Sequence, residues 1–122
     1  LLKPGGTLAV IYDCSAMPHD DLQSYDRRTN LPQYNPLGLL LAELGLRWQS
    51  RELNAEVLAH VRRRLAILPT LEQQYITEGN QFLYESHLAE ARGMERAYSN
   101  HAGGRHLYLI QQEAQSTSPE SA

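Results

Sequence analysis

The chain has 122 residues, enough for one small domain, and a formal net charge of −3 at pH 7. This charge argues against a protein that coats nucleic acid, because phosphate binding depends mainly on Lys and Arg. The single cysteine, Cys14, excludes an intramolecular disulfide and is typical of a reducing compartment, so we expect a cytoplasmic protein. No apolar stretch reaches the ~18–20 residues that a membrane-spanning helix requires, and we expect no membrane partner.

The chain opens with a turn that leads into an apolar strand. Pro4 restricts the residue before it, and Gly5-Gly6 permits the positive φ of a sharp reversal. Residues 7–12 are almost wholly apolar and lack the polar alternation of a half-exposed strand. This pattern predicts a strand covered on both faces, as in a parallel sheet flanked by helices.

A long segment, residues 14–35, separates this strand from the next helix. Asp20-Asp21 predicts the start of a short helix that reaches Arg28. Asn35-Pro36 marks a second helix start, with Asn as the N-cap. The apolar face of this helix is formed by leucines at helical spacing: Leu37, Leu40, Leu41 and Leu44. Gly45 ends the helix, and residues 46–53 predict a strand with Leu46 and Trp48 on one face.

Residues 54–100 predict a helical insert. Asn54 is expected to cap a helix whose apolar stripe runs from Leu58 to Leu68 and which Pro69 ends. Thr70 and Gln73 fit a capping box for another helix that breaks near Gly79, and a further helical stretch runs from Phe82 towards Asn100. Residues 105–113 predict a last strand entered from Gly103-Gly104, and residues 114–122 a disordered tail.

Three of these segments resemble one enzyme family. The Leu-Lys-Pro-Gly-Gly turn, followed by an apolar strand that ends at Asp13, resembles the entry to the fifth strand of class I S-adenosylmethionine-dependent methyltransferases. Residues 41–46 and the following strand resemble the helix and sixth strand of that fold. Residues 105–113 resemble its seventh strand, expected to run antiparallel at the end of the sheet. The resemblance implies an α/β fold: residues 1–113 form the C-terminal half of a Rossmann-like methyltransferase sheet, strands five to seven, with an added helical insert at about 54–100.

The resemblance also implies a reaction and a cofactor. In this family S-adenosylmethionine binds across the first four strands, beside a glycine-rich loop, and no segment of this chain matches that loop. We therefore assign no cofactor-binding residue here, and expect S-adenosylmethionine to bind to upstream residues of a larger parent enzyme, of which this chain is an inactive C-terminal fragment. The expected reaction is methyl transfer to a small-molecule acceptor, with nucleic acid disfavoured.

Candidate site residues follow the first strand. In open α/β sheets, ligands bind outside the carboxyl ends of the strands, so the segment after residue 12 is expected to border the pocket. Asp13 and His19 are candidate catalytic bases, and Asp13, Ser15, His19 and Tyr25 are candidate substrate-binding residues. In the alternative interpretation, Asp13 caps a turn and His19 is a solvated loop residue. The histidines show no spacing typical of a metal site, and we expect no metal.

Two other interpretations remain open at this point. In the first, the chain is part of a non-catalytic, methyltransferase-like subunit whose helical insert binds a partner or forms a homodimer. Alternatively, it is an unrelated α/β domain that shares only the Pro-Gly-Gly turn. Failure of residues 105–113 to pair antiparallel beside residues 46–53 would favour this last interpretation.

Overall fold

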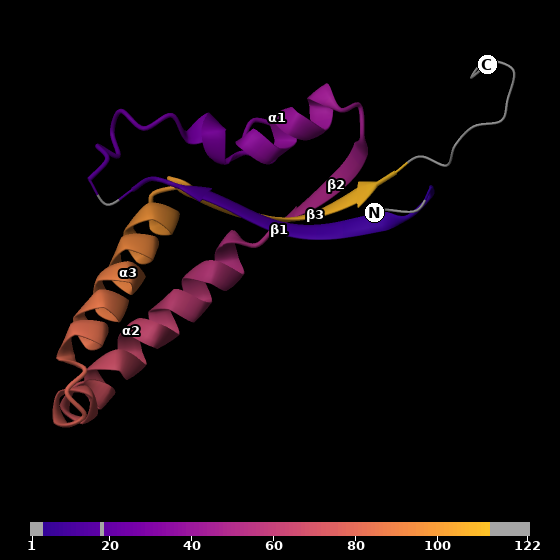
Figure 1. Cartoon of the computed structure of the whole chain (residues 1–122). Helices are drawn as coiled ribbons and strands as arrows, with labels where there is room; N and C mark the ends of the chain where they lie inside the picture. The colour runs from indigo at the N-terminus through magenta and orange to yellow at the C-terminus, as the bar shows by residue number, and fades with distance from the viewer. Residues whose placement is uncertain (1–3, 18, 113–122) are drawn as a thin grey trace, which may run out of the picture.

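A computed structural model shows a three-stranded sheet with one helix along one face and a helical hairpin that extends away from one end (Figure 1). The structure describes residues 4–17 and 19–112. The elements in chain order are β1 (Thr7–Ser15), the 3₁₀ helix η1 (Arg27–Asn30), α1 (Pro36–Glu43), β2 (Arg47–Glu52), α2 (Asn54–Thr77), α3 (Gln81–Ser99) and β3 (Gly103–Gln111). The predicted α/β class is confirmed. Among the described residues, no helix combines the length and the apolar character needed to cross a membrane.

The last strand lies in the middle of the sheet. β3 pairs antiparallel with β1, where Thr7 faces Gln111, and antiparallel with β2, where Glu52 faces His106. β1 and β2 therefore run parallel to each other on its two sides. The predicted antiparallel pairing with residues 46–53 is confirmed, whereas the predicted place at the end of the sheet is wrong, because β3 bonds a strand on each edge. Residue 113 of that predicted strand and the tail at 114–122 lie outside the described residues.

The turn before β1 and the start of α1 form as the local sequence predicts. Gly5 has a φ of 77°, and its N–H donates to the carbonyl of Gln112 at 2.9 Å, beside the start of β1. The side-chain oxygen of Asn35 accepts a hydrogen bond from the N–H of Gly38 at 2.8 Å, which caps α1. α1 then lies along one face of the sheet, where Leu41 packs with Tyr108 of β3.

The opposite face of the sheet is open over most of its length (Figure 1). The expectation that residues 7–12 are covered on both faces is wrong within the described part of the chain, because Ile11, on this open face, is 62% exposed. The cause is the direction of the insert. α2 and α3 leave the sheet at one end and extend away from it, so they contact β3 only near its start and do not lie on the face.

The insert is a single helical hairpin with its own core. The buried residues that α2 and α3 share are Val57, Val61, Leu68, Tyr84, Ala91, Ala97 and Tyr98. The predicted helix end at Pro69 is wrong, because α2 continues to Thr77. Proline inside a helix costs about 3 kcal/mol, and the packing of Leu68 against the hairpin core offsets this cost. The predicted capping box is also wrong: the hydroxyl of Thr70 donates to the carbonyl of Ile67 at 2.6 Å within the same helix.

The observed ends of the hairpin helices agree with the sequence-based predictions only in part. The predicted break at Gly79 is confirmed, with a φ of 75°. Asn54 does not cap α2; its side-chain oxygen accepts from the N–H of Arg105 at 2.9 Å, which attaches the hairpin to β3. The predicted short helix from Asp20 to Arg28 is also wrong, because turns precede the one-turn helix η1.

Candidate functional site

A cavity of about 470 Å³ lies where η1, the end of β2 and the start of β3 meet. It is on the same side of the sheet as α1, because His106 alternates with Arg105 and shares its face with Tyr108. The residues that line it are Arg27, Arg28, Asn30, Leu31, Pro32, Ser50, Glu52, Asn54, His101, Gly103 and His106. The lining therefore consists mainly of charged and polar side chains, with two apolar ones, Leu31 and Pro32.

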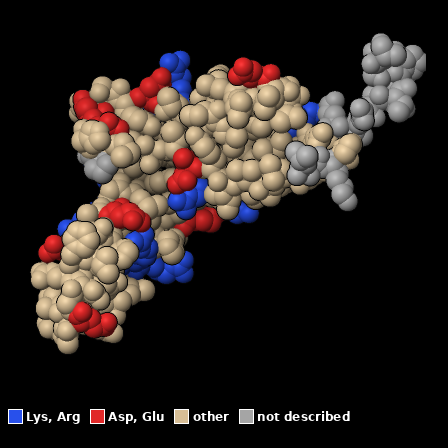
Figure 2. Space-filling view, viewed as in Figure 1, with Lys and Arg blue, Asp and Glu red and all other residues tan. Residues whose placement is uncertain are grey.

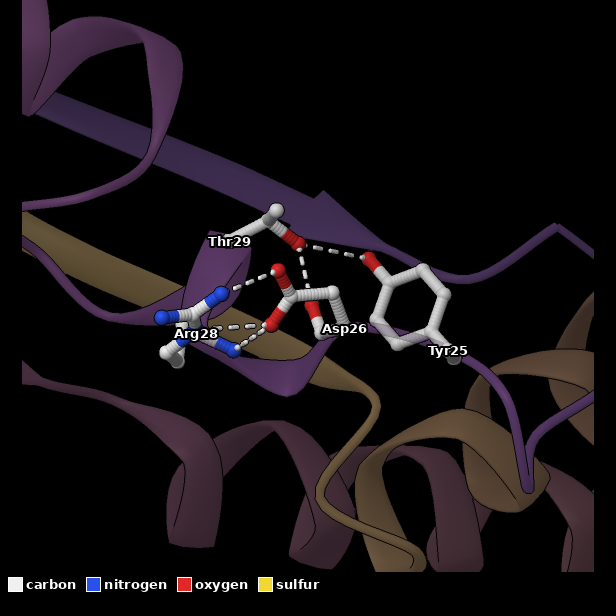
Figure 3. A network of polar contacts seen from close by, with 4 residues as sticks. All are labelled: Tyr25, Asp26, Arg28 and Thr29. Carbon is white, nitrogen blue, oxygen red and sulfur yellow. Dashed lines mark hydrogen bonds and ion pairs between the residues drawn. The ribbon is translucent and has the colours of Figure 1, made fainter.

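A network of short-range contacts around η1 holds Arg28, which lines one wall of the cavity (Figure 3). The carboxylate of Asp26 accepts hydrogen bonds from the backbone N–H and from Nε of Arg28, both at 3.1 Å. These bonds lower the pKa of Asp26. The hydroxyl of Thr29 donates to the carbonyl of Asp26 at 2.8 Å and to the hydroxyl of Tyr25 at 3.3 Å. The charge of Arg28 is thus matched within the segment itself.

A buried tyrosine fastens this wall to the sheet. Tyr108 has no exposed surface, and its hydroxyl donates to the carbonyl of Pro32 at 2.7 Å. The same hydroxyl accepts from Nδ2 of Asn35, also at 2.7 Å. A Cβ added at Gly104 would collide with the carbonyl of Asn30, so β3 and this wall meet at a glycine. The shape of the cavity therefore depends on contacts between residues far apart in the sequence.

His106 forms part of the opposite wall and is almost completely buried, with 4% of its surface exposed. Its Nδ1 has no hydrogen-bond partner within the described residues. Burial lowers the pKa of His106, and the negative charge of Glu52 opposes this shift only in part. The imidazole is therefore neutral at pH 7, and a neutral imidazole is able to accept a proton or a hydrogen bond.

Two lining charges have no counter-ion among the described residues. Nε of Arg27 donates to the carbonyl of Asn100 at 3.0 Å, and no carboxylate pairs with its guanidinium. The carboxylate of Glu52 forms no hydrogen bond or ion pair within the described part of the chain, whereas the neighbouring Arg51 pairs with Glu56 at 2.8 Å. The cavity thus presents one unneutralised cation on η1 and one unneutralised carboxylate on β2.

The candidate residues predicted from the sequence lie elsewhere. Asp13 forms an ion pair with Arg105 at 2.8 Å, on the face of the sheet opposite the cavity, and Ser15 lies exposed on that face. The side chain of His19 is 80% exposed, and its Nε2 is 3.9 Å from the carboxylate of Asp20. None of these residues lines the cavity. Tyr25 is connected to it indirectly, because its hydroxyl donates to the side-chain oxygen of Asn30 at 3.1 Å.

Sequence reasoning missed the residues on β2 and β3. Ser50 and Glu52 alternate with Gln49 and Arg51, so they fall on the expected inner face with Trp48. Polar residues on an inner face signal a site or a buried polar contact. The cross-strand partner of Glu52, His106, is distant in sequence, and only the pairing of β2 with β3 brings the two residues together.

The adjacent glycines at the start of β3 are closely packed. Gly103-Gly104 begins a strand instead of following one, and a Cβ at Gly103 would lie 2.9 Å from the ring of Tyr98. These glycines therefore permit close packing of β3 against Tyr98 and Asn30. No group of three His, Cys, Asp or Glu within the described ranges is arranged to hold a metal ion.

Comparisons of the chain with family models, with curated proteins and with solved structures found no match. Any function assigned to this chain therefore depends on its own residues and their geometry.

Proposed function

We propose that this chain is the C-terminal part of an S-adenosylmethionine-dependent methyltransferase that acts on a small-molecule acceptor. The observation that carries the proposal is the pairing of the strands. β1 and β2 run parallel, α1 connects them, and β3 returns antiparallel beside β2. Antiparallel pairing at this place is what the resemblance of residues 105–113 to a seventh strand requires. It also counts against an unrelated domain that shares only the Pro-Gly-Gly turn.

The free edge of β1 supports a larger sheet. Within the described residues, β1 pairs only with β3, and its other edge forms no ladder. β1 is nine residues long and carries exposed apolar side chains, including Ile11. A long exposed apolar edge is a site for pairing with a further strand. In the proposed enzyme the fourth strand occupies this edge, and S-adenosylmethionine, which supplies an activated methyl group, is bound by residues outside this chain.

The cavity supports a small acceptor. It lies beside the carboxyl end of β2, the end at which α/β sheets bind ligands. Figure 2 shows acidic and basic side chains side by side where the hairpin joins the sheet, with no large area of one sign on the face in view. Such a surface does not favour a nucleic-acid acceptor, whose phosphates require a basic patch. In this proposal, the chain binds and orients the acceptor.

A specific observation favours a second candidate function, a non-catalytic subunit that binds through its hairpin. Phe82 is 77% exposed near the tip of the hairpin, and neighbouring apolar side chains are also exposed: Leu71, Ile76 and Leu83. Exposed apolar groups of this kind mark contacts with other proteins or a second copy of the chain. Phe82 has no role in the cavity, so this function does not require a working methyl-transfer site.

A calorimetric titration distinguishes the two functions. S-adenosylmethionine is titrated into residues 1–122 and, separately, into the longer polypeptide that includes the sequence encoded upstream of Leu1. The methyltransferase proposal expects binding by the longer polypeptide alone. Absence of binding by both would refute methyl transfer and favour the non-catalytic subunit. Binding by residues 1–122 alone would contradict the placement of the cofactor outside this chain.

A further inference from the structure

We propose that the cavity between η1 and the strand ends binds a small zwitterion of the amino-acid class, with its carboxylate at Arg27 and its ammonium group at Glu52. Only the role of this ligand as the methyl acceptor rests on the proposed function. The binding itself depends on residues of this chain alone.

The carboxylate end is assigned from the difference between two adjacent arginines. The guanidinium of Arg28 is paired with Asp26, at 3.1 Å from Nε. Arg27 also lines the cavity, but its only hydrogen bond is to the carbonyl of Asn100. This bond orients the guanidinium and leaves its terminal N–H groups without a partner in the described part of the chain. Arginine in this state is suited to a carboxylate, because two parallel N–H groups match two carboxylate oxygens.

The ammonium end is assigned from Glu52, the last residue of β2. Its side chain shares a face with Ser50, and both line the cavity. Arg51 points to the other face and is already paired with Glu56. His106, which faces Glu52 across the strands, is held neutral by burial and does not cancel its charge. Glu52 therefore remains a negative partner for a protonated amine, with the hydroxyl of Ser50 as a second acceptor.

The charge pattern excludes other simple ligands. A dicarboxylate would place one anionic group near Glu52, and a diamine would place one cationic group near Arg27. Each would bring a lining charge close to a like charge, which is unfavourable. A zwitterion pairs with both. The volume, about 470 Å³, lies within the range of about 300–1,000 Å³ typical of small-molecule pockets. Leu31 and Pro32 supply an apolar wall for the body of the ligand.

The test is an NMR titration of the longest polypeptide that carries residues 1–122, uniformly ¹⁵N-labelled and without S-adenosylmethionine. The probes are three mixtures: the standard L-amino acids, the same amino acids as C-terminal amides, and the same amino acids as N-acetyl derivatives. Each compound is present at about 1 mM, where a ligand with a binding free energy of about −4 kcal/mol half-fills its site. Free amino acids are expected to shift the amide signals of Asn30, Ser50 and His106. Once the component that binds is identified, its amide and its N-acetyl form are each expected to bind at least tenfold more weakly.

Two variants locate the groups. Arg27→Gln is expected to weaken binding of the free amino acid about tenfold and to leave binding of the amide form unchanged. The substitution and the amidation remove the same interaction, so their effects do not add. Glu52→Gln is expected to weaken binding of the free amino acid about tenfold and to leave binding of the N-acetyl form unchanged. Arg63→Gln and Glu72→Gln are matched controls, since both residues are exposed on α2 away from the cavity.

Three results would overturn the proposal. These are absence of shifts at the cavity, tighter binding of dicarboxylates or diamines than of amino acids, and additive losses from Arg27→Gln and amidation. The comparison of the three mixtures needs no variant, so a variant that fails to fold does not remove the test. If the protein binds amino acids but not S-adenosylmethionine, methyl transfer is refuted and the amino-acid site stands. If it binds S-adenosylmethionine but not amino acids, only the amino-acid site is refuted.

Discussion

Replacement of Tyr108 by Phe tests whether the wall of the cavity is fastened to the sheet as described. The change deletes one hydroxyl from a side chain with no exposed surface. That hydroxyl makes two hydrogen bonds of 2.7 Å, one to the carbonyl of Pro32 and one from Nδ2 of Asn35. A buried hydrogen bond contributes about 1 kcal/mol, and leaving a buried partner unpaired costs about 1–3 kcal/mol. Because Asn35 is also fully buried, we expect the free energy of unfolding to fall by about 2–4 kcal/mol.

The assay is urea unfolding followed by the fluorescence of Trp48, the only tryptophan, whose ring lies 5.3 Å from that of Tyr108. Tyr34→Phe is the matched control: it deletes the same hydroxyl from a side chain that is 52% exposed and makes no side-chain hydrogen bond within the described residues. We expect this control to change the free energy by less than about 0.5 kcal/mol. If Tyr108→Phe is no more destabilising than Tyr34→Phe, the two buried hydrogen bonds do not hold the wall in place.

Two further predictions concern a buried histidine and a proline within a helix. Because burial lowers the pKa of His106, the unfolded chain binds more protons than the folded chain below the ordinary histidine pKa of about 6.5, so stability is expected to fall as the pH is lowered through that value. The loss is measured as the difference between the unfolding free energies at about pH 7.5 and about pH 5.5. His106→Phe should reduce this loss, whereas His60→Gln, at an exposed position, should not. An unchanged loss in His106→Phe would show that other groups cause it. Pro69 is exposed in the interior of α2, and Pro69→Ala restores a helical N–H, so we expect stabilisation by about 1–3 kcal/mol. Thermal and urea unfolding check this gain, and a loss of stability would show that the packing of α2 on α3 requires the proline.

The sequence predicts best those features that neighbouring residues determine. The start of α1 at Asn35-Pro36 and the reversal at Gly79 are correct because a cap and a positive φ are local requirements. Pro69 gives the wrong helix end because the contacts of Leu68 with the hairpin core, which the local sequence does not contain, oppose the local preference. Tertiary packing overrides intrinsic propensity in this way in many helices.

The candidate site was less predictable than the elements. Asp13, Ser15 and His19 were chosen because they follow a strand, but position along one strand does not determine which face or which neighbour a side chain meets. The cavity combines η1, β2 and β3, and Glu52 meets His106 only through the register of two strands that a long hairpin separates. The alternation that places Ser50 and Glu52 beside Trp48 was present in the sequence and was the usable signal.

The central position of β3 has a consequence for how this chain is made. Thr7 and Arg47 both pair with Gln111, so within the described residues neither outer strand has its partner until β3 has left the ribosome. The hairpin contains mainly local contacts and is able to form during translation, whereas this sheet must wait for β3. A polypeptide that ends shortly before Gly103 would therefore contain a folded hairpin joined to two unpaired strands, one of them apolar, and would be prone to aggregate and to be degraded.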